Sequence, residues 1–221
     1  MVSITEYITD LIALLQDTFG ERLNYVGLQG SYLRGEETES SDIDIMLVIE
    51  NLSVSDLDDY RVILKSLPCF EKSCGFICSR GDLAKWNPLE ICHLMHTTKD
   101  CFGTLSDIVP FYTKADIRNF VKMSVNNLYH AICHHYIHAE NNRDIENLSA
   151  CYKNAFFILQ NRYYLKSGRF IATKAELLSL LDGKDHAVLQ HAIELSRNIS
   201  HDFSESFALL FSWCQETMQE I

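Results

Sequence analysis

The sequence predicts an α+β protein, with an N-terminal mixed α/β sheet domain over residues 1–106 and a C-terminal helical bundle over residues 107–221. Three observations lead to this fold class. Period-two segments and helical segments are mixed in the first half, helix-like segments alone fill the second half, and Gly or Pro separates several of them. A chain of 221 residues is long enough for two domains of this size.

The first predicted element is an amphipathic helix over residues 4–19, which begins at a capping box after Ser3 and ends at Gly20. The rest of the N-terminal domain is predicted as strands over 24–29, 42–50, 70–79 and 89–96 and helices over 32–35 and 53–67. The C-terminal domain is predicted as helices over 114–139, 144–167, 173–182, 185–199 and 202–219.

Composition and charge exclude several classes of protein. With 47% hydrophobic and 22% charged residues, the chain is an ordinary globular protein. A net charge of −11 without a basic stripe argues against binding to long nucleic acids and favours small acceptors. No apolar run reaches the roughly 18 residues of a membrane span, and the start of the chain does not resemble a signal peptide. Eight cysteines without a Cys-x-x-Cys pair favour a reduced, cytoplasmic protein with no membrane partner.

The most informative stretch joins a Gly30-Ser31 turn to a strand that opens with Ser41-Asp42-Ile-Asp44. Residues i and i+2 of a strand share a face, so Asp42 and Asp44 are expected side by side, roughly 6–7 Å apart. Such carboxylates repel each other unless a cation or a proton lies between them, and Mg²⁺ accepts one or two of them together with phosphate oxygens. Gly30 allows backbone amides to approach a phosphate, and Ser31 adds a hydroxyl donor. Each motif alone is common, but their combination indicates a site for a nucleotide and a metal ion.

This combination resembles the signature of the polymerase-beta-like nucleotidyltransferase superfamily, especially its small bacterial members related to aminoglycoside nucleotidyltransferases. The resemblance is sharp over residues 25–50 and diffuse elsewhere. It implies that Asp42 and Asp44 are catalytic residues and metal ligands that hold Mg²⁺ against a nucleoside triphosphate. The expected nucleotide-binding residues are Gly30, Ser31, Arg34 and Ser41. Arg34 is expected either to pair with phosphate or the carboxylates, or to hold its loop through a salt bridge.

The resemblance implies an enzyme in which an acceptor oxygen attacks the α-phosphorus of a nucleoside triphosphate and pyrophosphate leaves. We expect AMP transfer from ATP, or transfer from another NTP, to a hydroxyl group of a small molecule. The resemblance makes an aminoglycoside-like antibiotic the leading acceptor; the acidic chain suits a cationic acceptor but does not identify it. The alternatives are an antitoxin-like or regulatory protein of this fold that binds a protein partner, and a protein adenylyltransferase. A homodimer is compatible with the resemblance, because some relatives build the cleft from two subunits.

A third carboxylate, which the superfamily normally places on a neighbouring strand, is not identified by the sequence. The strand segment 74–78 contains no acid. Glu90, expected to open the next strand, is the first candidate for the third catalytic acid, and Glu71 and Asp82 are weaker ones. This residue decides whether the site turns nucleotide over or only binds it.

A row of histidines suggests a second kind of site. His130, His134 and His138 are spaced to share one face of a predicted helix, with Cys133 and His135 nearby. Neutral histidine and cysteine suit zinc. One helix face presents at most two ligands of a tetrahedral site, however, and no partner cluster is recognisable elsewhere in the sequence. We therefore expect a polar helix face at this position, or histidines stacked at the contact between the domains.

Overall fold

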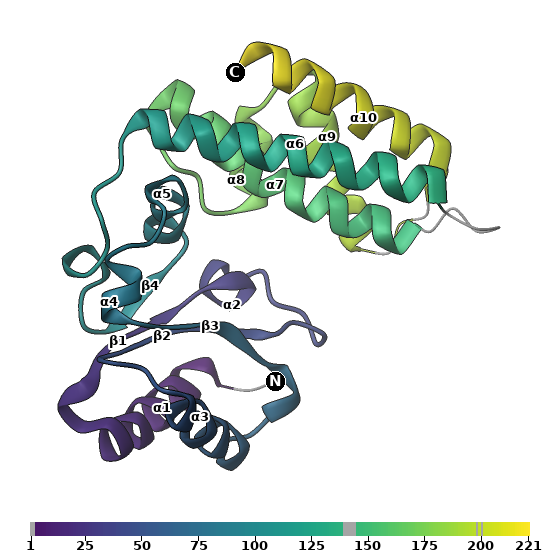
Figure 1. The fold of residues 1–221 in the computed structure, drawn as a ribbon. Helices are drawn as coiled ribbons and strands as arrows, with labels where there is room; N and C mark the ends of the chain where they lie inside the picture. The colour runs from purple at the N-terminus through teal and green to yellow at the C-terminus, as the bar shows by residue number, and fades with distance from the viewer. Residues whose placement is uncertain (1–2, 139–144, 198, 200) are drawn as a thin grey trace. The chain divides into compact units, whose positions relative to one another are not determined.

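The computed structural model describes residues 3–138, 145–197, 199 and 201–221. Within these residues the chain forms two compact units, Met1–Tyr112 and Thr113–Ile221. The first unit contains a four-stranded sheet with helices, and the second is built from helices (Figure 1). The predicted α+β fold class is confirmed. The division after Tyr112 falls a few residues later than the boundary expected between residues 106 and 107.

The first unit is organised around one mixed sheet. Its strand order is β3-β2-β1-β4, with β1 antiparallel to both β2 and β4 and with β3 parallel to β2. The elements in chain order are α1 (Ile4–Phe19), η1 (Gly20–Arg22), β1 (Leu23–Leu28), α2 (Gly30–Arg34), β2 (Ile43–Ile49), α3 (Val54–Ser66), η2 (Phe70–Lys72), β3 (Ser73–Ser79), α4 (Arg80–Leu83), α5 (Pro88–His96), β4 (Lys99–Phe102) and η3 (Leu105–Asp107).

Both faces of the sheet are covered, and the strand period decides which side chains point to each face. One face packs against α1 and α3 through alternate residues of β2, namely Ile43, Ile45, Leu47 and Ile49. On the other face, Met46 and Val48 pack with Leu83 of α4 and with partly buried side chains of α5. Figure 1 shows α1 and α3 on one side of the sheet and α4 and α5 on the other. Since even-numbered residues of β2 share a face, Asp44 faces the side of α4 and α5.

One prediction in this unit is wrong, and one strand was not predicted. The segment predicted as a strand over 89–96 is helix α5, which starts after Asn87, whose side chain accepts a hydrogen bond from Leu89 N at 3.2 Å. Pro88 occupies the first helical position, where its missing N–H has no intrahelical partner to lose. The sheet instead gains β4, a four-residue strand that is too short to show a period.

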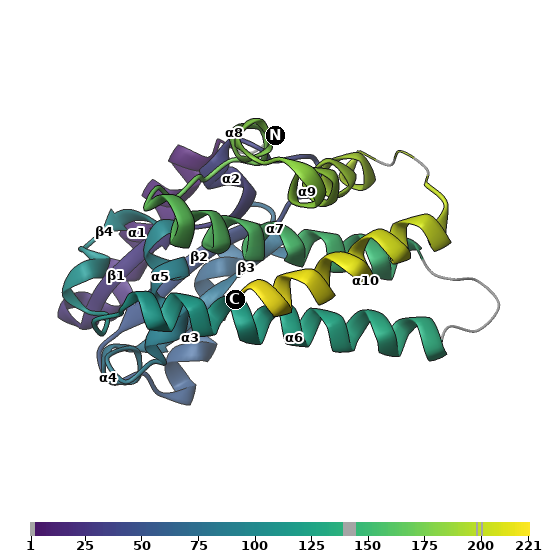
Figure 2. The same ribbon diagram turned by 90° about the horizontal axis from the view of Figure 1, so that it is seen from above.

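The second unit is a four-helix bundle with one additional short helix. Its elements are α6 (Lys114–His138), α7 (Ile145–Ser167), α8 (Lys174–Leu180), α9 (Gly183–Ser196) and α10 (Phe203–Glu220). Helix α6 packs on α7, α7 on α9, α9 on α10 and α10 on α6, so the four long helices enclose one core (Figure 2). The core is filled by large buried side chains, including Tyr152, Phe156, Leu189 and Trp213.

The helical pattern predicted for this unit is present, with ends that agree within a few residues. Predicted helix ends at residues 139 and 144, and residue 198, lie outside the described residues. None of the described helices is sufficiently long and apolar to cross a membrane.

Candidate functional site

The first feature of the site is a close contact between the first residue of α2 and the second residue of β2. Gly30 has a φ of +69°, which L side chains rarely adopt, and a Cβ added there would lie 1.9 Å from Asp44 Oδ2. Gln29 N donates to the backbone oxygen of Asp44 at 2.9 Å, which holds the end of β1 beside the start of β2. The structure therefore brings the Asp44 carboxylate directly against the glycine turn.

Asp42 lies on the same side. It is exposed and comes directly before β2, two residues ahead of Asp44. Cys74 pairs with Asp44 in the parallel register of β2 and β3. The pKa of the Cys74 thiol is raised, first by burial, then by the charge of Asp44 and a hydrogen bond with it, and finally by the charge of Asp42. Both carboxylates thus lie close to one thiol.

Cys74 occupies the position on β3 that is opposite Asp44, so no acid stands on the neighbouring strand at this point. The next residue, Gly75, leaves no room for a side chain, because an added Cβ would lie 1.9 Å from the backbone oxygen of Ile45. Asp82 is beyond the other end of β3, where its Oδ2 accepts from Ser79 Oγ at 2.6 Å. The third acid is therefore not supplied by β3.

Glu90 lies on α5 rather than at the start of a strand. Its Oε2 accepts a hydrogen bond from Trp86 Nε1 at 2.6 Å. The Trp86 ring meets the edge of Phe76, with centroids 5.1 Å apart, and Phe76 is on the same face of β3 as Cys74. Glu90 is thus on the side of the sheet that Asp44 faces, and the Trp86 indole links it to that face. Glu71, the other weak candidate, is exposed in η2.

The remaining predicted nucleotide-binding residues shape the loop between α2 and β2. Ser31 lies in the first turn of α2, and its backbone oxygen accepts from Glu36 N at 3.0 Å. Arg34 forms an ion pair with Glu36, with Nε and Oε2 3.0 Å apart, which corresponds to the loop-tethering alternative. Ser41 Oγ accepts from Thr38 N at 2.9 Å and so fixes the turn before Asp42.

One titratable residue near this loop was missed by the sequence interpretation. The pKa of His93, on α5, is lowered to about 4 by burial, with smaller contributions from the positive charges of Arg34 and His96. His93 is therefore neutral at physiological pH. Its position beside Arg34 was hidden because the segment was predicted as a strand; the Asn87-Pro88 start signal could have corrected this.

Residues 15–71 match the family model described as "Nucleotidyltransferase domain". The first unit contains a nucleotidyltransferase domain. Its range includes the Gly30-Ser31 turn and both Asp42 and Asp44, so the predicted resemblance to nucleotidyltransferases is confirmed. No curated protein sequence matches the chain.

The fold of the whole chain is similar to that of a spectinomycin adenyltransferase, AAD(9), from Enterococcus faecialis, crystallised with ATP and spectinomycin. The TM-score is 0.61 with 12% sequence identity, and the match covers 97% of this chain and 99% of the other. A toxin–antitoxin structure with AMP-PNP matches with a TM-score of 0.34 and 20% identity, over 52% of this chain and 85% of the other. The second similarity is too low to support an argument, whereas the first shows a shared fold.

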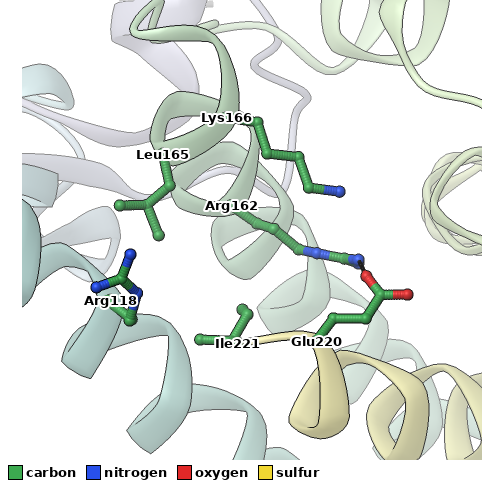
Figure 3. A pocket seen from close by; sticks show the side chains of 6 residues that line it. All are labelled: Arg118, Arg162, Leu165, Lys166, Glu220 and Ile221. Carbon is green, nitrogen blue, oxygen red and sulfur yellow. Dashed lines mark hydrogen bonds and ion pairs between the residues drawn. The ribbon is translucent and has the colours of Figure 1, made fainter.

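The helical unit that follows the nucleotidyltransferase domain has a small pocket of about 180 Å³ (Figure 3). It is lined by Arg118 of α6, by Arg162, Leu165 and Lys166 of α7, and by Glu220 and Ile221. Arg162 is compensated by Asp185 at 2.5 Å and by Glu220, toward which Figure 3 shows its guanidinium directed. Arg118 and Lys166 have no ion pair within the residues that the structure describes. The pocket wall is therefore cationic in an acidic chain.

The histidine row on α6 is a solvated helix face. His134 and His138 are exposed, with ring centroids 4.5 Å apart. No three potential metal ligands converge on α6 in the described part of the chain. A different group of histidines does converge elsewhere in the helical unit, which the sequence interpretation missed.

Proposed function

We propose that this protein transfers a nucleoside monophosphate, with ATP as the leading donor, to a hydroxyl group of a small molecule, with Mg²⁺ held by Asp42 and Asp44. The contact of Gly30 with Asp44 carries the proposal, because an added Cβ would lie 1.9 Å from the carboxylate oxygen. The nucleotidyltransferase domain supports the reaction class. The shared fold with an adenyltransferase crystallised with ATP supports ATP as donor.

The donor set of this site fits Mg²⁺. Asp42 and Asp44 share one strand face, and neither forms an ion pair with a described Lys, Arg or His. The missing Cβ of Gly30 leaves room for the Asp44 carboxylate against the turn. Carboxylate oxygens are hard ligands of the kind that Mg²⁺ binds, since the ion takes one or two of them together with waters and phosphate oxygens. When bound, the ion supplies charge neutralisation at the triphosphate and at the leaving pyrophosphate.

The chain's own residues provide positioning and proton transfer in this proposal. The acceptor oxygen forms a bond to the α-phosphorus, the bond from that phosphorus to the bridging oxygen breaks, and pyrophosphate leaves. Gly30 and Ser31 contact the terminal phosphates, while Arg34 and Ser41 maintain the loop that carries them. Glu90 is the candidate base for the acceptor proton; the indole of Trp86 binds one of its oxygens and fixes its orientation.

The acceptor is proposed to be a hydroxylated, cationic antibiotic of the aminoglycoside type. Two observations support this choice. The similar adenyltransferase was crystallised with spectinomycin, and the net charge of −11 favours a cationic acceptor over an anionic one.

The decisive experiment incubates the protein with Mg²⁺, ATP labelled at the α-phosphate, and a panel of aminoglycosides that includes spectinomycin. We expect pyrophosphate release and transfer of the label to one class of acceptor. Asp44→Asn is expected to abolish both, and the matched control Asp59→Asn, an exposed acid on α3, is expected to retain them. The proposal is refuted if ATP binds with Mg²⁺ but no small-molecule acceptor receives the label.

A second candidate is a nucleotide-binding protein that does not transfer, such as an antitoxin-like or regulatory partner of another protein. Cys74 favours it, because the residue opposite Asp44 on β3 is not an acid. This candidate predicts Mg²⁺-dependent ATP binding in calorimetry without pyrophosphate release. A protein adenylyltransferase would instead transfer the label to protein. Light scattering separates a monomer of 25.4 kDa from a homodimer.

A further inference from the structure

Three side chains of metal-ligating type converge where α9 ends and α10 begins. His191 and Glu194 are one helical turn apart on α9, and His201 lies in the connection just before α10. One nitrogen from each histidine and one oxygen of Glu194 lie within 4.8 Å of one another. Among the residues that the structure describes, no other three His, Cys, Asp or Glu side chains come this close.

The arrangement differs from an ordinary hydrogen-bonded ion pair. His201 Nε2 lies 3.1 Å from Glu194 Oε2, yet it is buried and makes no hydrogen bond to any described residue. In a simple pair the N–H would be aimed at the carboxylate oxygen. Two ligand atoms at this separation match neighbouring ligands of a tetrahedral zinc ion, which lie roughly 3.3 Å apart for bonds of about 2.0 Å.

Outer hydrogen bonds orient two of the three side chains. Ser206 Oγ donates to the backbone oxygen of Asp202 at 2.7 Å, so at 2.8 Å it accepts from His191 Nε2. This fixes the His191 tautomer and leaves Nδ1 with the free lone pair. Gln190 Nε2 donates to Glu194 Oε1 at 2.6 Å, which leaves Oε2 for another partner. Metal ligands in proteins are characteristically held by such outer partners.

We propose that His191, Glu194 and His201 form a binding site for a divalent transition metal, with Zn²⁺ as the best match. Two imidazoles and one carboxylate are a recurrent zinc ligand set that leaves the fourth position for water. The site joins the end of α9 to the segment before α10, so a bound ion restrains this connection and stabilises the helical unit. It is separate from the Asp42 and Asp44 pair in residues, ligand chemistry and ion.

The test uses the full chain, stripped with a chelator and kept in excess Mg²⁺ so that Asp42 and Asp44 are not available to zinc. Calorimetric titration with Zn²⁺ is expected to show one tight equivalent, with an increase in Tm. His201→Ala and Glu194→Gln are each expected to raise the Kd by at least tenfold and to remove the Tm increase. The matched control His134→Ala, from the exposed row on α6, is expected to bind as the unmodified chain does. Unchanged binding by His201→Ala, or loss of binding in the control, overturns the proposal.

A second variant separates metal binding from a purely structural role. Ser206→Ala keeps all three ligands but removes the hydrogen bond to His191, and is expected to weaken Zn²⁺ binding roughly tenfold or more. Co²⁺ used as a probe is expected to give ligand-field bands without thiolate charge transfer. A Ser206→Ala variant that is folded and binds with unchanged affinity contradicts the assignment, as does a thiolate band, which would place the ion on a cysteine.

Discussion

Asp42 and Asp44 in the first unit and Asp185 in the helical unit have opposite surroundings. In the nucleotidyltransferase unit, Asp42 and Asp44 lie beside each other with no ion pair to any described cation. In the helical unit, Asp185 accepts from both Arg162 at 2.5 Å and Trp213 Nε1 at 2.7 Å, and so is fully compensated. Carboxylates that stabilise a fold are given partners within the fold. Carboxylates left without a cation are available to bind a metal ion, and this difference can be tested by substitution.

The largest expected effect is that of Asp44→Asn, or equally Asp42→Asn. Loss of one carboxylate should reduce nucleotidyl transfer roughly a hundred- to a thousandfold, on the scale of losing one preorganised electrostatic group. The Tm should remain the same or rise, because repulsion between the two acids is relieved. Pyrophosphate release and thermal unfolding measure the two effects. A loss of Tm together with activity would show that these acids are structural.

Arg162→Ala tests the acids of the helical unit that are paired with a cation. Removing this cation takes the ion-pair partner from Glu220 and from Asp185, which keeps only the hydrogen bond from Trp213 Nε1, at a place where the Arg162 side chain is only 8% exposed. We expect the helical unit to lose about 3–5 kcal/mol of stability, measured by urea unfolding. ATP affinity of the folded protein should not change. A change in ATP affinity without loss of stability would assign the cationic pocket to nucleotide binding.

Gly30→Ala and Gly35→Ala form a matched pair in the loop. Both glycines have positive φ, +69° and +65°, so each substitution should cost about 1–2 kcal/mol of backbone strain. Only the Cβ at position 30 would collide with Asp44; position 35 has open space. Activity should therefore be lost in Gly30→Ala and retained in Gly35→Ala. Equal losses of activity would show that loop strain, rather than the contact with Asp44, matters.

Cys74→Asp adds a third carboxylate opposite Asp44, with Cys74→Ser as the control for loss of the thiol. Mg²⁺-dependent ATP binding should tighten by about fivefold, which corresponds to about 1 kcal/mol from one added charge in a hydrated site. If Glu90 already serves as the third acid, Glu90→Gln should reduce turnover and Cys74→Asp should not rescue it. Rescue would show that β3 is the natural position of this group.

The smallest effect concerns pH and His93. In the unfolded chain its pKa is about 6.5, whereas in the fold it is lowered to about 4, so the unfolded state binds more protons between these values. The contribution of His93 to the free energy of unfolding should be constant above about pH 6.5 and should decrease as the pH falls toward 4. His93→Gln should flatten that decrease in urea titrations at several pH values. His96 and His191, whose pKa values are also lowered, should account for the slope that remains.

The sequence predicted those features that depend on short-range periodicity. The turn at Gly30 and the shared face of Asp42 and Asp44 follow from the two-residue period of a strand. The segment of Glu90 was predicted wrongly because it is rich in apolar residues, although Ile91, Leu94 and Met95 have the spacing of a helix face and the cap at Asn87 starts a helix. The neighbour of Asp44 across the sheet could not be predicted, because the β2–β3 register depends on packing of the whole unit.

Prediction in the helical unit had the same limit. The helices follow from their apolar stripes, but the direction of the chain after α9 decides whether His201 meets His191. The spacing of His191 and Glu194 on one helix face was visible in the sequence and could have indicated part of the site.

The backbones of β2 and β3 approach closely at Gly75, and this limits where β3 could carry an acid beside Asp44. No side chain fits at position 75, and the next outward-facing residue, Phe76, is engaged by Trp86. Among β3 residues beside Asp44, only position 74 can carry an additional charge without rebuilding the sheet. A single substitution at position 74 would therefore change the number of carboxylates in this part of the sheet from two to three.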